Sequence, residues 1–196
     1  MVIFMHSIQC NCGAVKGKLE NIGTSNRLIC YCTDCRAFAH FLDKAPAILD
    51  AQGGTEIVQV AQQHLLFSQG EEFLSAVRLS EKGMIRWYAS CCGTPIGNTL
   101  ASPKMSFIGL IHNCLDRQQM DKDFGAKVAV LNTDTALGHV KPKQSGLFGF
   151  LFRFLWIVTT NRINGGYKKS ALFNATGLPR VTSETLRADE LDKLKN

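Results

Sequence analysis

The chain has 196 residues, of which 45% are hydrophobic, and its formal net charge is +6. These values are typical of one globular domain with a full apolar core, and they exclude a disordered chain and a small disulfide-dependent scaffold. No apolar run reaches the roughly 20 residues that a membrane-spanning helix needs, so we expect no transmembrane span. Residues 1–9 lack the pattern of a secretory signal peptide, so we expect a cytoplasmic protein.

Short stretches rich in β-branched and aromatic residues, separated by turn residues, fill the first 115 positions and predict a mainly β fold. One short helical turn is expected at 36–41. The expected strands are a pair on either side of a turn within 2–19, followed by 25–31, 47–49, 56–60, 65–68, 73–79, 84–89, 94–100 and 106–111.

The character of the sequence changes after residue 115. Residues 116–130 are more polar, and Lys141-Pro142-Lys143 is typical of a linker. Residues 184–195 are expected to form a short polar helix, capped by Thr182 or Ser183. We therefore predict a β domain over 1–115 and a C-terminal extension over 116–196 that packs on it, with an apolar helix near 146–162.

The segment 147–158 is apolar at every position except Arg153, so periodicity does not decide between helix and strand. Its length and the Gly165-Gly166 pair beyond it favour a helix. Three roles stay open for this helix. It could cover an open face of the sheet, lie in a membrane surface with help from the basic tail, or mediate self-association.

The charge is concentrated at one end of the chain. Residues 1–140 contain 12 Lys and Arg residues and 12 Asp and Glu residues, whereas residues 141–196 contain 10 and 4. The C-terminal segment therefore carries the whole net charge. Cysteine-rich zinc modules that bind nucleic acid usually carry basic residues beside their metal ligands. Here these residues lie far from the cysteines in sequence, so we expect no nucleic-acid binding.

Seven of the eight cysteines fall in three tight clusters. These are Cys10 and Cys12, then Cys30, Cys32 and Cys35, and then Cys91 and Cys92. On an extended chain, residues two apart point to the same side, so a Cys-x-Cys step aims two sulfur atoms at one ion. A Cys-x-x-Cys turn does the same. Sulfur ligands at these spacings favour Zn²⁺, and we expect one or two zinc ions.

Two other interpretations of the cysteines are weaker. A disulfide framework is typical of small secreted chains in an oxidising compartment, which this chain does not resemble. Buried free thiols are the second interpretation, and they suit Cys114, which stands alone in the apolar run 107–115. Neither explains why the other seven are clustered.

The three clusters, in this order, resemble the glutathione-dependent formaldehyde-activating enzyme family, which includes centromere protein V. That family has Cys-x-Cys-Gly, then Cys-His-Cys-x-x-Cys-Arg, then Cys-x-x-Cys-Gly-[Ser/Thr]-Pro. The matching segments here are Cys10-Asn11-Cys12-Gly13, Cys30-Tyr31-Cys32-Thr33-Asp34-Cys35-Arg36 and Cys92-Gly93-Thr94-Pro95. The resemblance covers roughly residues 7–115.

The resemblance implies small antiparallel sheets held by zinc, the β-tent fold, with a helical appendage at the C-terminal end of this chain. It implies a structural zinc site formed by the first and third clusters. It also implies a second site with an open coordination position, at which Cys30, Cys32 and Cys35 would be the catalytic ligands. The implied activity is that of a carbon–sulfur lyase acting on the formaldehyde adduct of glutathione or another small thiol.

The chain departs from the family pattern at three places. Tyr31 replaces the usual His, and Ala89 stands where the third cluster would begin, so that Cys91 lies directly beside Cys92. Neighbours on an extended chain point to opposite faces, so we expect Cys92 to be the zinc ligand. Cys91 then either bends back to complete the site, points to the middle cluster, or is a free thiol. The bulky residues 37–41 are expected to crowd the middle site.

Two side chains near the middle cluster are candidate proton donors or acceptors, namely Asp34 and His40. For both, a structural role is the stronger expectation, and His64 and His112 have no ligand-like spacing. The alternative to an enzyme is a non-catalytic zinc-stabilised module whose C-terminal extension contacts a protein partner or a membrane surface.

Overall fold

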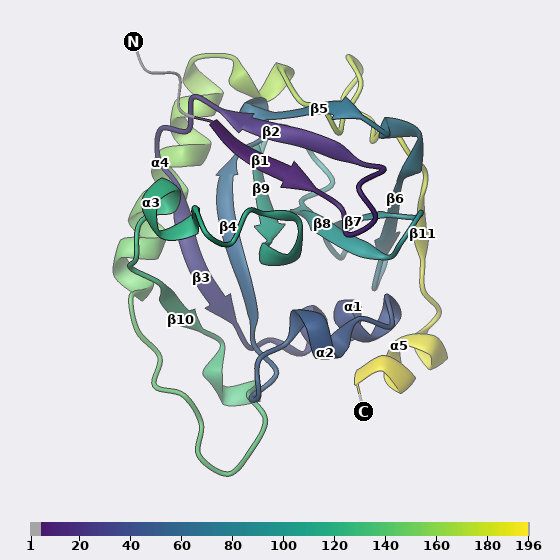
Figure 1. The fold of residues 1–196 in the computed structure, drawn as a ribbon, viewed down its shortest axis with the longest axis vertical. Helices are drawn as coiled ribbons and strands as arrows, with labels where there is room; N and C mark the ends of the chain where they lie inside the picture. Colours follow the sequence, from purple (N-terminus) through teal and green to yellow (C-terminus); the bar gives the residue numbers. More distant parts are fainter. Residues whose placement is uncertain (1–4, 196) are drawn as a thin grey trace.

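The computed structural model describes residues 5–195, so the beginning of the expected strand pair at 2–4 lies outside the described residues. The fold is mainly sheet, with helices around it (Figure 1). A three-stranded antiparallel sheet consists of β1 (Met5–Gln9), β2 (Lys16–Glu20) and β5 (Leu65–Gln69). The second sheet has eight strands, in the spatial order β10 (Ala129–Leu131), β3 (Asn26–Cys30), β4 (Thr55–Ala61), β9 (Phe107–Ile111), β8 (Thr94–Thr99), β7 (Ile85–Ala89), β6 (Leu74–Arg78) and β11 (Ser183–Thr185).

The main core lies between the two sheets. Ile8 and Leu19 from the small sheet pack in one cluster with Val58, Trp87 and Leu110 from the large one. The alternation of buried and exposed residues along β1 shows why only one face of the small sheet is apolar. In β9 every residue is buried, because the strand lies in the middle of the large sheet with both of its faces covered.

Five α-helices lie around the sheets in residues 5–195. They are α1 (Thr33–Phe41), α2 (Ala45–Ile48), α3 (Met120–Phe124), α4 (Leu147–Ile163) and α5 (Ala188–Lys195). Helices α1 and α2 lie at one end of the large sheet, and α5 contacts α1 there (Figure 1). Helix α4 lies along β3, β4 and β10 (Figure 1). No helix among residues 5–195 is long and apolar enough to cross a membrane.

The structure corrects the expected strand at 47–49. This segment is the end of α2 and a single bridge from Leu49 to Thr55. Pro46 in the first turn of α2 explains the difference, because its fixed φ angle suits the beginning of a helix and it offers no N–H to a neighbouring strand. A run of three apolar residues is too short to distinguish the two-residue period of a strand from the 3.6-residue period of a helix.

The C-terminal part of the chain provides both edges of the large sheet, through β10 and β11. Both pair in parallel, β10 with β3 and β11 with β6. The helix expected over 184–195 is therefore shorter than predicted: β11 takes Ser183–Thr185, and α5 begins at Ala188. The division at residue 115 stays a prediction, and strands from both sides of it share one sheet.

Candidate metal centres

The first and third cysteine clusters meet in space. Cys10 and Cys12 lie in the turn between β1 and β2, and Cys91 and Cys92 lie in the turn between β7 and β8. Their four sulfur atoms all lie within 4.8 Å of one another. The turn from the small sheet and the turn from the large sheet are therefore brought together at this cluster.

The sulfur–sulfur distances test whether zinc fits. The Cys12–Cys91 distance is 3.4 Å, the Cys10–Cys12 distance is 3.5 Å, and the Cys10–Cys91 and Cys91–Cys92 distances are both 3.8 Å. Four sulfur atoms at about 2.3 Å from a tetrahedral zinc lie about 3.8 Å from one another. The cluster therefore has the size and the donor atoms of a closed four-sulfur site.

Cys91 and Cys92 both face this cluster because the backbone around them is not extended. The amide of Gly93 donates a hydrogen bond to the carbonyl of Ala89 at 2.8 Å, and the φ angle of Gly93 is +67°. A left-handed glycine at this point closes a tight turn. The sequence left three positions open for Cys91. In the structure it bends back towards Cys10 and Cys12.

The surroundings favour the thiolate form at Cys92 but not at Cys91, whose pKa is raised by burial and by hydrogen bonds with the neighbouring thiols. The amide of Val15 donates to the sulfur of Cys10 at 3.2 Å. Burial disfavours the thiolate of Cys92, but the hydroxyl of Thr94, 3.0 Å from the Cys92 sulfur, and two backbone N–H groups outweigh it and lower the pKa of Cys92 to about 6. A lowered pKa makes the metal-binding form available near neutral pH.

The middle cluster forms where β3 ends and α1 begins. Cys30 is the last residue of β3, Cys32 is the N-cap of α1, and Cys35 lies in the first turn of the helix. Their sulfur atoms also lie within 4.8 Å of one another. The extended backbone of Cys32 and the helical turn after it explain how a Cys-x-Cys-x-x-Cys sequence gathers three sulfur atoms. The N-terminal end of α1 also favours negative charge at this place.

Among the three thiols, only Cys30 favours the thiolate form. Hydrogen bonds from Cys32 and Cys35 lower the pKa of Cys30 far below its ordinary value, and the side-chain amide of Asn132 donates to the same sulfur at 3.1 Å. The same interactions raise the pKa values of Cys32 and Cys35. A cation at this position would relieve that competition, because it would stabilise all three thiolates at once.

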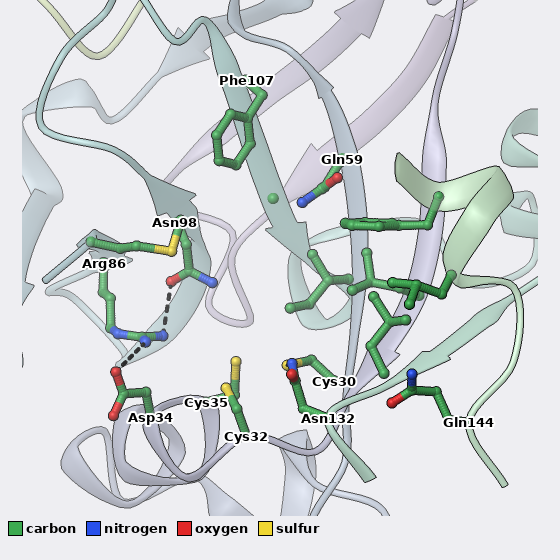
Figure 2. Close-up of a pocket in the computed structure, with 17 residues that line it drawn as sticks. Cys30, Cys32, Asp34, Cys35, Gln59, Arg86, Asn98, Phe107, Asn132 and Gln144 are labelled. Carbon is green, nitrogen blue, oxygen red and sulfur yellow. Dashed lines mark hydrogen bonds and ion pairs between the residues drawn. The ribbon is translucent and has the colours of Figure 1, made fainter. Parts of the chain in front are cut away.

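The middle cluster lies on the wall of a cavity of about 530 Å³ (Figure 2). This volume is within the usual range of small-molecule sites. Figure 2 shows the three sulfur atoms pointing into this space, with Asn132 beside them. The polar lining consists of Asp34, Gln59, Arg86, Asn98, Asn132 and Gln144, and the apolar lining includes Leu28, Ile57, Phe107, Leu131, Leu147 and Phe150. The cavity is not lined by Cys10, Cys12, Cys91 or Cys92.

Arg86 is the buried cation of the cavity wall, with only 4% of its surface exposed. Its guanidinium donates to Asn98 Oδ1 at 3.3 Å and lies 3.8 Å from the carboxylate of Asp34 (Figure 2). It also lies over the ring of Phe38. Its Nε atom is buried without a hydrogen-bond partner. Lys195 from α5 lies 3.2 Å from the same carboxylate. Asp34 therefore lies between two cations.

The structure separates the remaining sequence candidates from the two clusters. Residues 37–39 are buried under the sheet, and no residue of 37–41 lines the cavity, so the expected crowding is wrong. His40 and His64 do not line the cavity either. Cys114 is buried and close to the carbonyl of Ile96, and burial raises its pKa to about 12.

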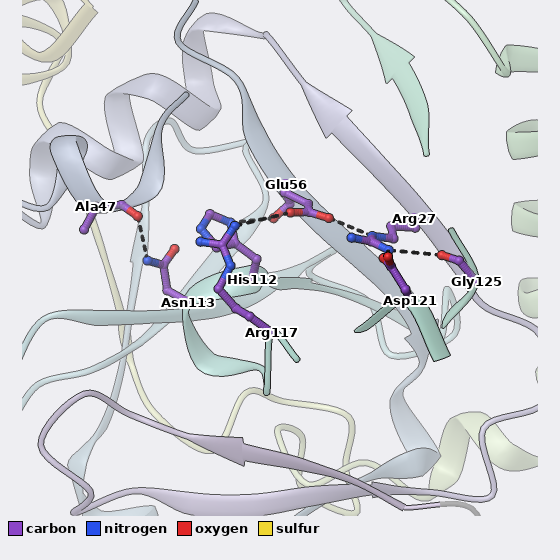
Figure 3. A network of polar contacts seen from close by, with 8 residues as sticks. All are labelled: Arg27, Ala47, Glu56, His112, Asn113, Arg117, Asp121 and Gly125. Atoms are coloured by element: carbon purple, nitrogen blue, oxygen red, sulfur yellow. Dashed lines mark hydrogen bonds and ion pairs between the residues drawn. The ribbon is translucent and has the colours of Figure 1, made fainter. Parts of the chain in front are cut away.

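His112 belongs to a structural network rather than to a ligand set (Figure 3). Its ring Nδ1 lies 3.4 Å from the backbone carbonyl of Glu56, and burial lowers its pKa. The carboxylate of Glu56 accepts a hydrogen bond from Arg27 at 2.7 Å, and Arg27 continues to Asp121 (Figure 3). This network ties β3 and β4 to the segment around α3.

Comparisons with known proteins place the chain in a family. No curated protein matches it. A crystal structure of a Rhodobacter sphaeroides protein, a target of the Northeast Structural Genomics programme, is similar at 17% identity and a TM-score of 0.44, over 64% of this chain and 99% of that one. A family of unknown function, DUF6151, matches residues 3–146, a range that contains all seven clustered cysteines. The chain therefore belongs to the DUF6151 family.

Proposed function

We propose that this protein is a zinc-dependent carbon–sulfur lyase that acts on the formaldehyde adduct of a small thiol, such as glutathione. The observation that carries the proposal is the three-cysteine cluster on the wall of an open cavity. Three sulfur ligands leave one coordination position unfilled, which is typical of a catalytic zinc site, whereas four sulfur ligands are typical of a structural one. The resemblance to the formaldehyde-activating enzymes supports the same assignment of one catalytic site and one structural site.

The two clusters have different roles in this proposal. Cys10, Cys12, Cys91 and Cys92 would hold a structural zinc that joins the turns of the two sheets. Cys30, Cys32 and Cys35 would hold the second ion. When bound there, zinc would supply a Lewis acid that stabilises a substrate sulfur in its thiolate form.

The reaction needs a leaving thiolate and a proton acceptor. In the adduct, a sulfur atom is bonded to a CH₂OH group. The carbon–sulfur bond breaks, its electron pair stays on sulfur, and the hydroxyl oxygen becomes the carbonyl oxygen of formaldehyde as its proton leaves. Asp34 is the one carboxylate among the described residues that line the cavity, so we assign it as the acceptor.

Arg86 gives the substrate a second point of attachment. A guanidinium that lines the cavity is well suited to a carboxylate, which accepts charge-assisted hydrogen bonds. Glutathione and simpler thiol acids carry such a group. We therefore assign Arg86 as a substrate-positioning residue and the class of substrate as anionic thiol adducts.

Replacing Arg86 with methionine tests this assignment. We expect KM for the glutathione adduct to rise about tenfold or more, because one charge-assisted hydrogen bond contributes about 1.5–3 kcal/mol. We expect kcat to change about twofold or less. The adduct of 2-mercaptoethanol, which has no carboxylate, serves as the matched control substrate, and steady-state kinetics measures both. An equal rise of KM for the two adducts would show that Arg86 supports the fold and does not recognise charge.

A direct test of the whole proposal uses the cobalt-substituted protein. Cobalt(II) replaces zinc in thiolate sites and gives them visible absorption. We expect the spectrum to change when glutathione is added, because the thiol enters the open position, and we expect no such change in Cys32→Ser. Zinc-loaded protein should also release formaldehyde from the adduct. A protein with full metal content, an unchanged cobalt spectrum and no turnover would support the non-catalytic zinc module instead.

A further inference from the structure

Helix α4 exposes a large apolar face. Phe148 is 88% exposed, Phe152 is 65% exposed and Trp156 is 54% exposed. The opposite face packs on the large sheet through Phe154 and Ile157. The exposed apolar residues of α4 are Leu147, Phe148, Leu151, Phe152, Leu155, Trp156 and Ile163. We call this set the α4 face. A continuous apolar surface of this kind is rare on a protein that has no partner.

Cations flank the α4 face at both ends. Lys141 and Lys143 precede the helix, and Arg162, Lys168 and Lys169 lie at or beyond its C-terminal end, all of them exposed. Arg162 and Lys168 both contact the ring of Tyr167, at 5.5 Å and 5.9 Å, so these two charges are held together. The sequence contains no Asp or Glu from residue 135 to residue 183. The segment that carries the apolar surface therefore contains positive charges alone.

We propose that the α4 face docks on the surface of a membrane that contains anionic lipids. The exposed aromatic and aliphatic side chains would enter the region between headgroups and acyl chains, and the flanking cations would contact the lipid phosphates and carboxylates. Trp156 suits this boundary because its ring is apolar and its N–H group is polar. The helix lies flat on the surface, with the sheet behind it on the aqueous side.

The charges also argue against a second copy of this chain as the occupant. If two α4 faces paired antiparallel, Lys141 and Lys143 of one copy would meet Arg162 and Lys168 of the other. If they paired in parallel, the cations at the N-terminal ends of the two helices would face one another, and so would the cations at the C-terminal ends. In both arrangements like charges would be brought together with no acidic residue of this segment to compensate. An anionic surface compensates both ends at once.

The chain contains its own reporter for this interaction. It has two tryptophans. Trp87 is 0% exposed in the core between the sheets, whereas Trp156 lies on the α4 face. Because Trp87 is already shielded from water, a blue shift of the fluorescence on addition of vesicles reports Trp156 entering an apolar environment.

The test mixes the full zinc-loaded chain with large vesicles of phosphatidylcholine, with and without about 30% phosphatidylserine. We expect the blue shift and co-sedimentation with the anionic vesicles. We expect binding to fall at least tenfold between 50 mM and 500 mM salt, because the electrostatic part is screened. Phe148→Ser combined with Phe152→Ser should remove binding at low salt. Leu178→Ser, which changes an exposed leucine outside α4, is the matched control and should bind as the unmodified chain does.

Two results would overturn the proposal. The first is a monomeric chain that binds neither vesicle while its zinc content and circular dichroism are unchanged. The second is a dimer in light scattering that the Phe148→Ser and Phe152→Ser pair converts to a monomer, without any vesicle binding. That result would assign the α4 face to self-association.

Discussion

Replacing Cys12 with serine is expected to remove one zinc ion and to lower the unfolding midpoint by about 10 °C. Cys12 is exposed, so the change removes no buried apolar surface and the effect reports the metal alone. A bound ion present at several hundred times its dissociation constant stabilises the folded state by about 3–4 kcal/mol. For a domain of this length, each kcal/mol corresponds to about 2–4 °C. Differential scanning fluorimetry and elemental analysis measure the two quantities.

The control for this prediction is chelation. With a strong zinc chelator present, the Cys12→Ser variant and the unmodified chain should unfold at nearly the same temperature, because both then lack the ion. If the variant still unfolds about 10 °C lower under chelation, the cysteine contributes through contacts of its own and the structural zinc is not the cause. A variant that keeps two zinc ions per chain would equally contradict the assignment.

The second large effect is expected on activity. Cys32→Ser should lower kcat/KM for the glutathione adduct by about a thousandfold or more, because it removes a ligand of the ion that stabilises the leaving thiolate. The unfolding midpoint should fall about as far as in Cys12→Ser, because each variant loses one bound ion. The variant should lose one zinc ion. Release of formaldehyde and free thiol is followed in the same steady-state assay.

Cys12→Ser serves as the matched variant in the activity assay. At a temperature where it is folded, it should retain most of the lyase activity, because its sulfur does not line the cavity of the middle cluster. Loss of activity in both variants with retention of both zinc ions would contradict the separation of a structural site from a reactive one.

The sequence indicated the cysteine clusters well, because the spacing of ligands within one turn is a local property. The gathering of Cys30, Cys32 and Cys35 follows from the end of one strand and the first turn of the next helix. The meeting of the first and third clusters came from the family resemblance. The position of Cys91 could not be predicted, because it depends on the turn closed by Gly93.

The residues that line the cavity could not be predicted from the sequence. Asn132 lies 102 residues from the sulfur that it contacts, and Arg86 lies 52 positions after Asp34 with nothing local to connect them. A single Asn or Arg in a strand or loop has no distinctive pattern. Periodicity also left 147–158 ambiguous, although length favoured the helix that is present, since one of its faces is buried and the other is apolar but exposed.

The long separation between Cys30 and Asn132 has a consequence for synthesis of the protein. At about 5–20 residues per second, the ribosome adds the intervening 102 residues in roughly 5–20 s. The three thiols therefore leave the ribosome before β10, which pairs with β3, and before the part of the cavity wall that begins at Leu131. The nascent chain therefore presents an open trio of sulfur atoms to its surroundings. Oxidants and competing metal ions have their best access to the middle cluster before the protein is complete.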